Sequence, residues 1–488
     1  MPPMKSALFA TKPIAQLLAD ADSSHAMKRS LGMMDLVALG IGGIIGSGIF
    51  VITGEAAAAH AGPAIIVSFL VAGLVAALAA LCYSEMAAMI PISGSAYTYT
   101  YATMGELIAW IIGWDLILEY LVGAAAVSVG WSGYVTTFFG QITGLSLPHE
   151  WIGAPVAWDA GEGALVWSGN YLNLPAVAIT LFVTGVLILG VRESARLNVG
   201  IVFVKIAVLL AFIAAAAPFI RPEHWQPFVP PNDGGFGHFG YSGIFQGATV
   251  VFFAYIGFDA VSTAAQECRK PQRDLPLGIL ISLAVSTVFY IAVAAVLTGV
   301  VSYKTLGVPN PIDVGIAATG FHWLQVVVDI GAIAGLTSVM LVLLLGQPRI
   351  FLAMAKDGLL PPWAARVHPR LGTPYVTTLI TGVACAVMGG VLPIGILSDL
   401  TSIGTLFAFF LVCLGVMVLR RRLPDAERPF RLPFGAYLIP LLGAGSAAAL
   451  MSAANPASLV RLFVWMAIGM AIYGLYGRRH SKLRNRSD

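Results

Sequence analysis

Long apolar segments, separated by short polar connections, run along almost the whole chain. A helix needs about 20 apolar residues to cross a bilayer, and by this criterion we predict twelve transmembrane helices. They cover residues 33–60, 63–90, 105–139, 171–190, 196–219, 241–267, 276–301, 322–355, 374–393, 396–419, 434–454 and 457–477. The pattern predicts an all-α integral membrane protein with 12 transmembrane helices.

The first apolar segment contains a glycine-rich run, LGIGGIIGSGIFVITG, at residues 39–54. Glycine costs about 1 kcal/mol in a helix interior, so we predict a helix that breaks at Gly46, Ser47 and Gly48. Backbone that leaves helical geometry within a bilayer must be buried in protein or line a wet cavity, which makes the break a candidate binding site. The alternative is close helix packing through Gly42 and Gly46 at GxxxG spacing.

The sixth apolar segment has a second interruption, within VVFFAYIGFDAVST. Gly257 lies in the middle of this segment, Asp259 follows two residues later, and each interrupted segment begins a block of five segments. This arrangement is the one expected of a five-plus-five inverted repeat in which two broken helices meet at the bilayer midplane. The second break therefore favours the binding-site interpretation of the first.

The repeat divides the chain into five parts. They are a cytoplasmic N-terminal arm (1–27), a first five-helix repeat (28–219), a second five-helix repeat (220–419), helices 11 and 12 (420–477) and a basic cytoplasmic tail (478–488). The last two helices lie outside the repeat, so we expect them to serve packing or oligomerisation.

The composition excludes a water-soluble protein, because 58% of the residues are hydrophobic, 10% are charged and the mean hydropathy is +0.85. The four cysteines lie in or beside predicted spans at unrelated spacings, so we expect neither a metal site nor a disulfide framework. The chain has no HExxH, GxSxG or P-loop motif. We therefore expect no enzyme, no cofactor and no ATP-driven pump.

The basic residues are distributed asymmetrically between the predicted connections. With the N terminus inside, all but four of the 27 Lys and Arg residues fall at the inner face, and the loop at 140–170 has none. Cytoplasmic loops carry the excess of Lys and Arg. We therefore predict that both termini are cytoplasmic and that the protein lies in the cell (inner) membrane.

Four ionisable residues lie within or at the ends of the predicted spans. Glu85 lies near the inner end of span 2, where we expect a salt bridge, and Asp115 in span 3 is close enough to the cytoplasm to be interfacial. Glu119 lies one helical turn deeper, and Lys205 is about 13 Å inside span 5 at 1.5 Å per residue. Ionisable groups at this depth usually face the bundle interior, so Glu119 and Lys205 are candidate functional residues.

Four stretches resemble the amino acid-polyamine-organocation (APC) superfamily, in particular bacterial members of the cationic amino acid transporter (CAT) branch. They are GIGGIIGSGIFVITG, SGSAYTYTYATMGELIAWIIGWDLILEY, FFAYIGFDAVSTAAQECRKPQRDLP and FLAMAKDGLLP. The resemblance covers all twelve spans and implies the leucine-transporter fold with alternating access. Because the branch includes carriers of cationic and of small neutral amino acids, the substrate stays open.

The resemblance also implies roles for the two breaks. Backbone amides of the first break would bind the substrate carboxylate, from Ile45, Ser47 and Gly48. Backbone carbonyls of the second break would bind the substrate ammonium group, from Phe253, Ala254 and Ile256. An aromatic side chain, Phe252 or Tyr255, would close over the substrate as a gate.

The same resemblance assigns Lys205 to proton coupling. It matches a lysine of proton-coupled relatives whose ammonium group takes the place of the sodium ion of sodium-coupled ones, and Thr337 and Ser338 match hydroxyl groups that would line that sodium site. The alternative is that Lys205 stays protonated and only joins spans 1, 5 and 8. Glu119 is the second candidate for proton coupling, or attracts a cationic substrate.

Together these observations predict a secondary active transporter of L-amino acids that works by proton symport. The alternatives within transporters are an amino acid exchanger and a carrier selective for cationic amino acids. A channel or a membrane enzyme would belong to another class, but the chain has no ring of acids, filter sequence or catalytic motif. The expected partners are an amino acid, protons and the lipid bilayer, and not nucleic acid.

Overall fold

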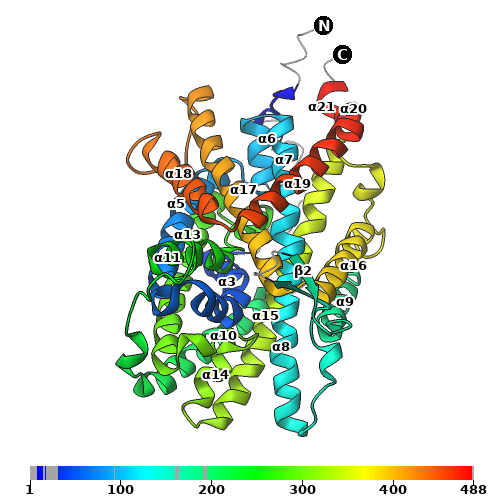
Figure 1. Ribbon diagram of the computed structural model, residues 1–488. Helices are drawn as coiled ribbons and strands as arrows, with labels where there is room; N and C mark the ends of the chain where they lie inside the picture. The colour runs from blue at the N-terminus through cyan, green and yellow to red at the C-terminus, as the bar shows by residue number, and fades with distance from the viewer. Residues whose placement is uncertain are drawn as a thin grey trace.

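The computed structural model describes residues 8–14, 17, 31–92, 94–159, 164–190 and 195–485. The predicted arm at 1–27 therefore lies mostly outside the described residues, as do the last three residues of the tail. The described chain is an elongated bundle of tilted helices, in which the blue, green and yellow segments of distant sequence pack side by side (Figure 1).

The helices follow one another along almost the whole described chain. The first half contains α3 (Met33–Ile44), η1 (Gly48–Ile52), α4 (Thr53–Ala56), η2 (Ala57–Ala61), η3 (Gly62–Ala64), α5 (Ile65–Met89), α6 (Ser95–Thr103), α7 (Glu106–Ile117), η4 (Leu118–Val122), α8 (Gly123–Thr143), η5 (His149–Trp151), α9 (Leu174–Ile188), α10 (Ala195–Ala216), η6 (Ala217–Phe219) and η7 (Pro222–Trp225). The second half contains α11 (Gly240–Val251), η8 (Phe252–Tyr255), α12 (Ala260–Thr263), η9 (Ala265–Glu267), α13 (Pro271–Val300), η10 (Tyr303–Thr305), α14 (Pro311–Ala317), α15 (His322–Lys356), η11 (Pro362–Ala365), α16 (Tyr375–Val391), α17 (Ile394–Arg422), α18 (Leu438–Ala453), α19 (Pro456–Ile472), η12 (Tyr473–Gly477), α20 (Arg478–His480) and α21 (Lys482–Asn485).

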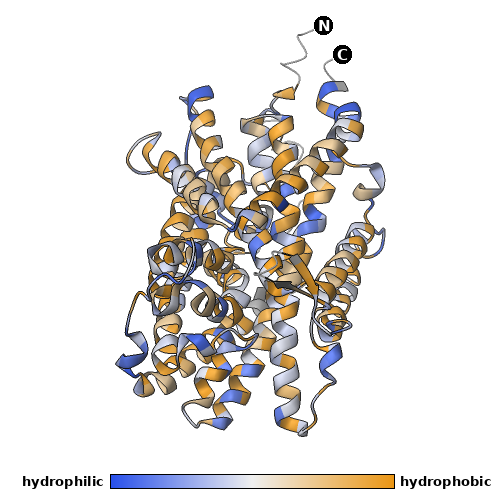
Figure 2. Cartoon of the chain, viewed as in Figure 1, coloured by the Kyte–Doolittle hydropathy of each residue, from blue (hydrophilic) through white to orange (hydrophobic). Residues whose placement is uncertain are grey.

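Eight helical stretches are long and apolar enough to cross a membrane, and three shorter apolar helices accompany them. One stretch, Met33–Met89, has 57 residues, which at 1.5 Å per residue would extend about 85 Å, far more than a bilayer core of about 30 Å. Gly62, with φ +59°, and Pro63 divide this stretch. Hydrophilic residues gather toward the two ends of the bundle and apolar residues cover its middle (Figure 2).

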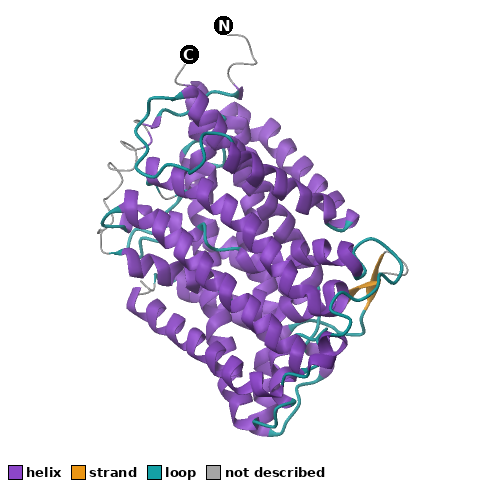
Figure 3. Cartoon of the chain, turned by 90° about the vertical axis from the view of Figure 1, so that its left-hand side faces the viewer, coloured by secondary structure: helices purple, strands orange, loops and turns teal. Residues whose placement is uncertain are grey.

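A two-stranded antiparallel hairpin departs from the all-α prediction. Strand β1 (Val156–Asp159) pairs with β2 (Ala164–Trp167), with Trp158 opposite Leu165. Figure 3 shows it as the orange element at one edge of the helical bundle. Valine and tryptophan favour strands, and the hairpin lies in the long connection before α9, outside the apolar helices.

Glycines allow α3 to pack closely against its neighbours. A Cβ atom on Gly40 would lie 2.3 Å from the Ser282 hydroxyl of α13, and one on Gly278 of α13 would lie 2.9 Å from Leu36 Cβ. Gly40, at one end of the glycine-rich run, therefore serves helix packing. Other glycines in the run lie at the break itself.

At the other end of α5, Glu85 forms the expected salt bridge. Its fully buried carboxylate accepts hydrogen bonds from Nε and Nη2 of Arg420 and from the backbone N–H of Leu432. Arg428 Nε lies 3.4 Å from Glu85 Oε1. Buried charges need such partners, so the contacts explain Glu85 without a role in transport.

Candidate functional site

The helix of the first apolar segment breaks where the glycine-rich run predicts. Helix α3 ends at Ile44, Ile45 is extended with ψ 101°, and the chain turns helical again immediately afterwards. The Gly46 carbonyl accepts hydrogen bonds from the amides of Ile49 and Phe50, so Gly46 begins the second half of the helix. First-turn amides have no partner within a helix, so the amides of Ser47 and Gly48 are not used by the half-helix that they begin.

The second break lies between α11 and α12. The backbone of η8 (Phe252–Tyr255) is a 3₁₀ turn, Ile256 is extended with ψ 140°, and Gly257 has φ +106°. A residue with a Cβ atom would be strained at this φ. The Gly257 interruption predicted from the sequence is therefore required by the backbone conformation.

The two breaks meet in the structure. A Cβ atom on Gly48 would lie 2.3 Å from Ala254 Cα, and one on Gly43 would lie 3.2 Å from the Gly257 carbonyl oxygen. The hydroxyl of Tyr290 on α13 lies 2.7 Å from the Ile44 carbonyl oxygen and 2.6 Å from the Ala254 carbonyl oxygen. One buried hydroxyl group thus satisfies backbone from both breaks.

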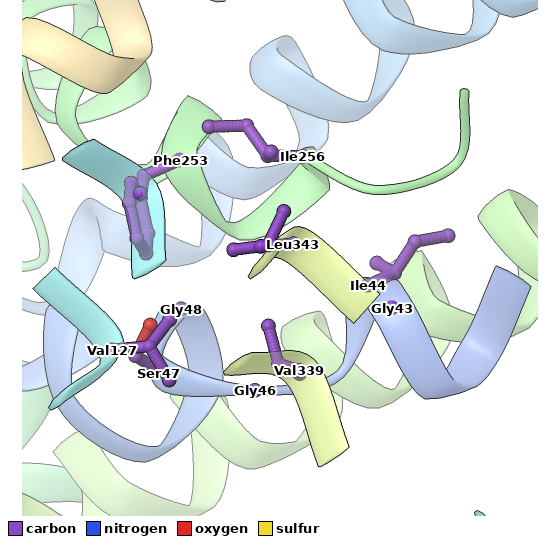
Figure 4. Close-up of a pocket in the computed structure, with 11 residues that line it drawn as sticks. Gly43, Ile44, Gly46, Ser47, Gly48, Val127, Phe253, Ile256, Val339 and Leu343 are labelled. Atoms are coloured by element: carbon purple, nitrogen blue, oxygen red, sulfur yellow. The ribbon is translucent and has the colours of Figure 1, made fainter. Parts of the chain in front are cut away.

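A cavity lies between the breaks and two long helices (Figure 4). Its polar surface comes from the irregular backbone and the Ser47 side chain, and its apolar surface from α8, α15 and η8. The lining residues are Gly43, Ile44, Gly46, Ser47, Gly48, Gly123, Val127, Phe253, Ile256, Val339 and Leu343. No charged side chain is among these described lining residues.

Four of the seven predicted substrate-binding residues line this cavity: Ser47, Gly48, Phe253 and Ile256. The other three lie just behind the lining and already have partners. The Ile45 amide, predicted to bind the carboxylate, donates to the Ile41 carbonyl, and the Ile45 carbonyl accepts from Lys205. The Ala254 carbonyl accepts from Tyr290, and the Phe252 ring packs against Phe409 with centroids 5.6 Å apart.

The predicted gate is arranged differently from the expectation. The ring of Phe253 lines the cavity, whereas the neighbouring ring of Phe252 is fully buried behind it. The hydroxyl of Tyr255 donates to the Phe69 carbonyl on α5. Of the aromatic residues of η8, Phe253 is the one placed to contact a bound molecule.

Lys205 lies at the first break. Its fully buried Nζ donates to the carbonyl oxygens of Gly42 at 2.8 Å and Ile45 at 2.9 Å, and its side chain packs against Gly335 of α15, where a Cβ atom would lie 3.0 Å from Lys205 Cε. Carbonyls that leave a helix within a membrane need a donor. The ammonium group therefore supplies the donor that the broken helix lacks.

The two hydroxyl residues expected near Lys205 differ from each other. Thr337 Oγ1 accepts from Trp131 Nε1 and donates to the Ile333 carbonyl, so it is directed toward α8. Ser338 is 2% exposed and its hydroxyl has no hydrogen-bond partner among the described residues. Only Ser338 remains available for a ligand.

Glu119 lies beside Asp259, a residue to which the sequence assigned no role. The two carboxyl groups are within hydrogen-bond range of each other, and both side chains are buried. Asp259 Oδ2 accepts from the Tyr120 hydroxyl at 2.6 Å and the Ser95 hydroxyl at 3.0 Å, whereas Glu119 has no donor among the described residues. Two adjacent buried carboxyl groups need a shared proton.

Asp115 is enclosed by the protein, whatever its depth in the membrane. Its side chain is fully buried and lies close to Gly404 of α17, where a Cβ atom would come within 3.3 Å of Asp115 Oδ1. Neither carboxylate oxygen has a donor among the described residues. The position one helical turn before Glu119 is therefore covered by packing helices, which the sequence of α7 alone does not reveal.

Sequence reasoning missed several residues of the site. Tyr290 had a signal, because it is a hydroxyl-bearing side chain in the middle of an apolar helix. The cavity residues Gly123, Val127, Val339 and Leu343 had none, since an apolar residue that faces a cavity cannot be distinguished by type from one that faces a neighbouring helix.

The chain matches the family model "Amino acid permease" over residues 31–473. It is 46% identical to the branched-chain amino acid permease BcaP of Bacillus subtilis, over 98% of this chain and 100% of that protein. It is 43% identical to the methylthioribose transporter of the same organism, over 98% and 99% of the two chains. It is also 37% identical to the vacuolar cationic amino acid transporter 4 of Arabidopsis thaliana, over 83% of this chain and 65% of that one. These matches and the apolar helices show that this chain is a multi-pass membrane protein of the amino acid permease family, within the APC superfamily.

Proposed function

We propose that this protein is a secondary active transporter of L-amino acids with uncharged, apolar side chains, and that the substrate binds between the two broken helices. The observation that carries the proposal is the cavity itself, where free first-turn amides, irregular backbone carbonyls and apolar side chains converge. Membership of the permease family supports amino acid transport.

The backbone of the cavity suits the zwitterionic part of an amino acid. The amides of Ser47 and Gly48 begin a half-helix, whose positive end favours a carboxylate. Carbonyls of the second break accept from the substrate ammonium group, with Ile256 lining the cavity and Ala254 already sharing the Tyr290 hydroxyl. An anion site and a cation site therefore lie on opposite sides of one small cavity.

The apolar lining decides the class of side chain. Val127, Val339 and Leu343 offer only hydrocarbon, and Gly123 adds no side chain beside them. A guanidinium or ammonium group enclosed there would lack the acid that a buried cation requires, because Glu119 pairs with Asp259 and does not line the cavity. This disfavours the carrier of cationic amino acids that the resemblance left open. The printed name of the Bacillus subtilis relative, a branched-chain amino acid permease, agrees with this choice.

Coupling to protons is the second part of the proposal, with Lys205 and Glu119 as the coupling residues and Asp259 added to them. Loss of the proton from Lys205 would remove the charge that holds Gly42 and Ile45 together. A fixed ammonium group at this position would also exclude sodium. Substrate exchange remains the alternative mechanism, because the same cavity serves both.

The arrangement in the membrane follows from the same reasoning. We propose twelve spans, in which Met33–Met89 supplies two and the shorter apolar helices α9, α16 and α18 supply one each. The two breaks lie in the first helix of each half, as a five-plus-five inverted repeat requires. Both termini are proposed to be cytoplasmic, and Lys12 and Lys482 support a common side because both contact Asp357.

Counterflow in proteoliposomes tests the substrate class. Liposomes preloaded with leucine should take up labelled leucine, and external valine or isoleucine should compete, whereas arginine and lysine at the same concentration should not. Glu119→Gln should keep this order of competition, because Glu119 does not line the cavity. Competition by arginine equal to that by valine would contradict the proposal.

A further inference from the structure

A second buried pair of carboxyl groups lies outside the cavity lining, on the face proposed to be outer. Asp313 belongs to the short helix α14, and Asp329 lies about 10 Å from the start of α15 at 1.5 Å per residue. The two carboxyl groups are within hydrogen-bond range of each other, and the side chains are 2% and 0% exposed. Neither residue has a part in the proposed transport site.

The pair lacks the donors that buried carboxylates require. Asp313 Oδ2 accepts from the Asn310 amide at 2.8 Å, but Asp313 Oδ1 and both oxygens of Asp329 have no donor in bonding geometry among the described residues. The exposed amide of Gln141 on α8 interacts with Asp329 from one side. Two facing carboxylates are both acceptors, so the contact is attractive only when a proton lies between them.

No cation is among the groups of the described residues that act on the pair. From α8, the ionisable group that faces it is the Tyr134 hydroxyl, which donates to the Phe50 carbonyl at 2.6 Å. The acid of α4, Glu55, lies against Gly395 of α17 and interacts with Asp399 instead. Helices α10 and α13 also pack against α14. In α10 the ammonium group of Lys205 binds carbonyls of the first break, and in α13 the Tyr290 hydroxyl binds the carbonyls of Ile44 and Ala254. Arg273 and Asp274 lie in the first turn of α13, at the opposite end. Lys304, in η10, is exposed, as is His322 at the start of α15.

Helix α14 covers the half-helix that follows the first break. It packs against η1 and α4, where a Cβ atom on Gly54 would lie 2.4 Å from both Leu306 O and Pro311 Cβ. Asn310 also donates to Thr137 of α8 at 3.0 Å. A change in the contact between Asp313 and Asp329 would therefore move the element that lies over the carboxylate side of the transport cavity.

We propose that Asp313 and Asp329 form an outer proton-binding site, and that the shared proton latches α14 over the first broken helix. Burial raises the pKa of Asp313, so the latched state is favoured at low external pH and is lost as the external pH rises through this raised pKa. The carboxylates then repel each other and α14 is released. The latch itself does not depend on the substrate, whereas its effect on transport rests on the proposed function.

The latch is tested by labelling a cysteine beneath α14. Ile316 is fully buried on this helix, and all four native cysteines are buried, so Ile316→Cys reports lifting of α14 to a membrane-impermeant maleimide. The labelling rate is divided by that of Ser168→Cys, an exposed reference that corrects for the pH dependence of the thiol. We expect the ratio to rise at least fivefold between external pH 5.5 and 8.5.

Asp329→Asn decides whether the pair is responsible. An asparagine amide donates an N–H hydrogen to Asp313 at any pH and takes up no proton from solution. The latch should therefore stay closed, and the labelling ratio should be flat across this pH range. Asp233→Asn, an exposed residue on the same face, should keep the response of the parent. Three outcomes would each overturn the proposal. They are a pH response that persists in Asp329→Asn, a flat response in the parent, and protection of the Ile316→Cys thiol from labelling by sodium at pH 8.5.

Transport separates this proposal from the previous one. With internal pH held at 7, leucine exchange by the parent should slow as the external pH rises, and exchange by Asp329→Asn should not. If the protein exchanges no amino acid but the labelling ratio responds as expected, the proposed function fails and the latch stands. If exchange is present and the ratio is flat in the parent, the latch fails alone.

Discussion

The two broken helices are irregular in the same way but are held differently. At the first break, the carbonyls of Gly42 and Ile45 accept from the ammonium group of Lys205. At the second, the Ala254 carbonyl accepts from the neutral hydroxyl of Tyr290. A tyrosine ordinarily keeps its proton throughout the physiological pH range, whereas a buried lysine is able to lose its charge there. The carbonyls of the first break are therefore held by a group whose charge can change, whereas the Ala254 carbonyl is held by one that stays neutral.

The tyrosine also connects the breaks. The hydroxyl group has one proton to donate, and the carbonyl oxygens of Ile44 and Ala254 lie 2.7 Å and 2.6 Å from the hydroxyl oxygen. A movement of the first break therefore changes the hydrogen bonding of the second, because both accept from the Tyr290 hydroxyl. This provides a route by which the charge of Lys205 influences both halves of the substrate site.

The largest effect is expected from filling the first break. Gly48→Leu should abolish substrate binding, because even a Cβ atom there would lie 2.3 Å from Ala254 Cα and Cβ. Binding of labelled leucine to detergent-purified protein measures the loss. The matched control is Gly185→Leu on α9, where a Cβ atom would meet nothing within 4 Å and binding should equal that of the parent. Equal binding by Gly48→Leu would place the site elsewhere.

A smaller effect is expected from separating the breaks. Tyr290→Phe removes the hydroxyl donor that the two buried carbonyls share, at a cost of about 1–3 kcal/mol. Leucine affinity should therefore fall by roughly 5- to 150-fold if the breaks must be joined to bind. Tyr241→Phe, at a residue that is 79% exposed, controls for the loss of a hydroxyl. Unchanged affinity in Tyr290→Phe would show that the two breaks act independently.

The glycines within two apolar segments predicted where the helices break. Glycines at Gly46, Gly48 and Gly257 are costly in a helix, and the structure uses each of them at a point where a side chain would clash or φ is positive. Of the predicted binding residues, Ser47, Gly48, Phe253 and Ile256 do line the cavity. A broken helix is predictable from the sequence because its backbone requires glycine at particular positions.

Side-chain orientation and tertiary pairing could not be predicted from the sequence in this way. Val339 and Leu343 face the cavity rather than a neighbouring helix only because of how α15 is rotated. The pairing of Glu119 with Asp259 joins two residues that are distant in sequence and become neighbours only when the second break packs against η4. Contacts of this kind depend on tertiary packing, which the periodicity of a single helix does not specify.

The central claim is that proton coupling resides at the first break, and driven uptake tests it directly. In sodium-free proteoliposomes with an inward proton gradient, the parent should accumulate leucine above the external concentration, and Lys205→Ala should not. Exchange at equal pH should persist in Lys205→Ala at a reduced level, because the cavity lining is intact. Lys304→Ala, at an exposed lysine, should accumulate leucine as the parent does. Accumulation by Lys205→Ala driven by the proton gradient alone would contradict the claim and would move the coupling to Glu119 and Asp259.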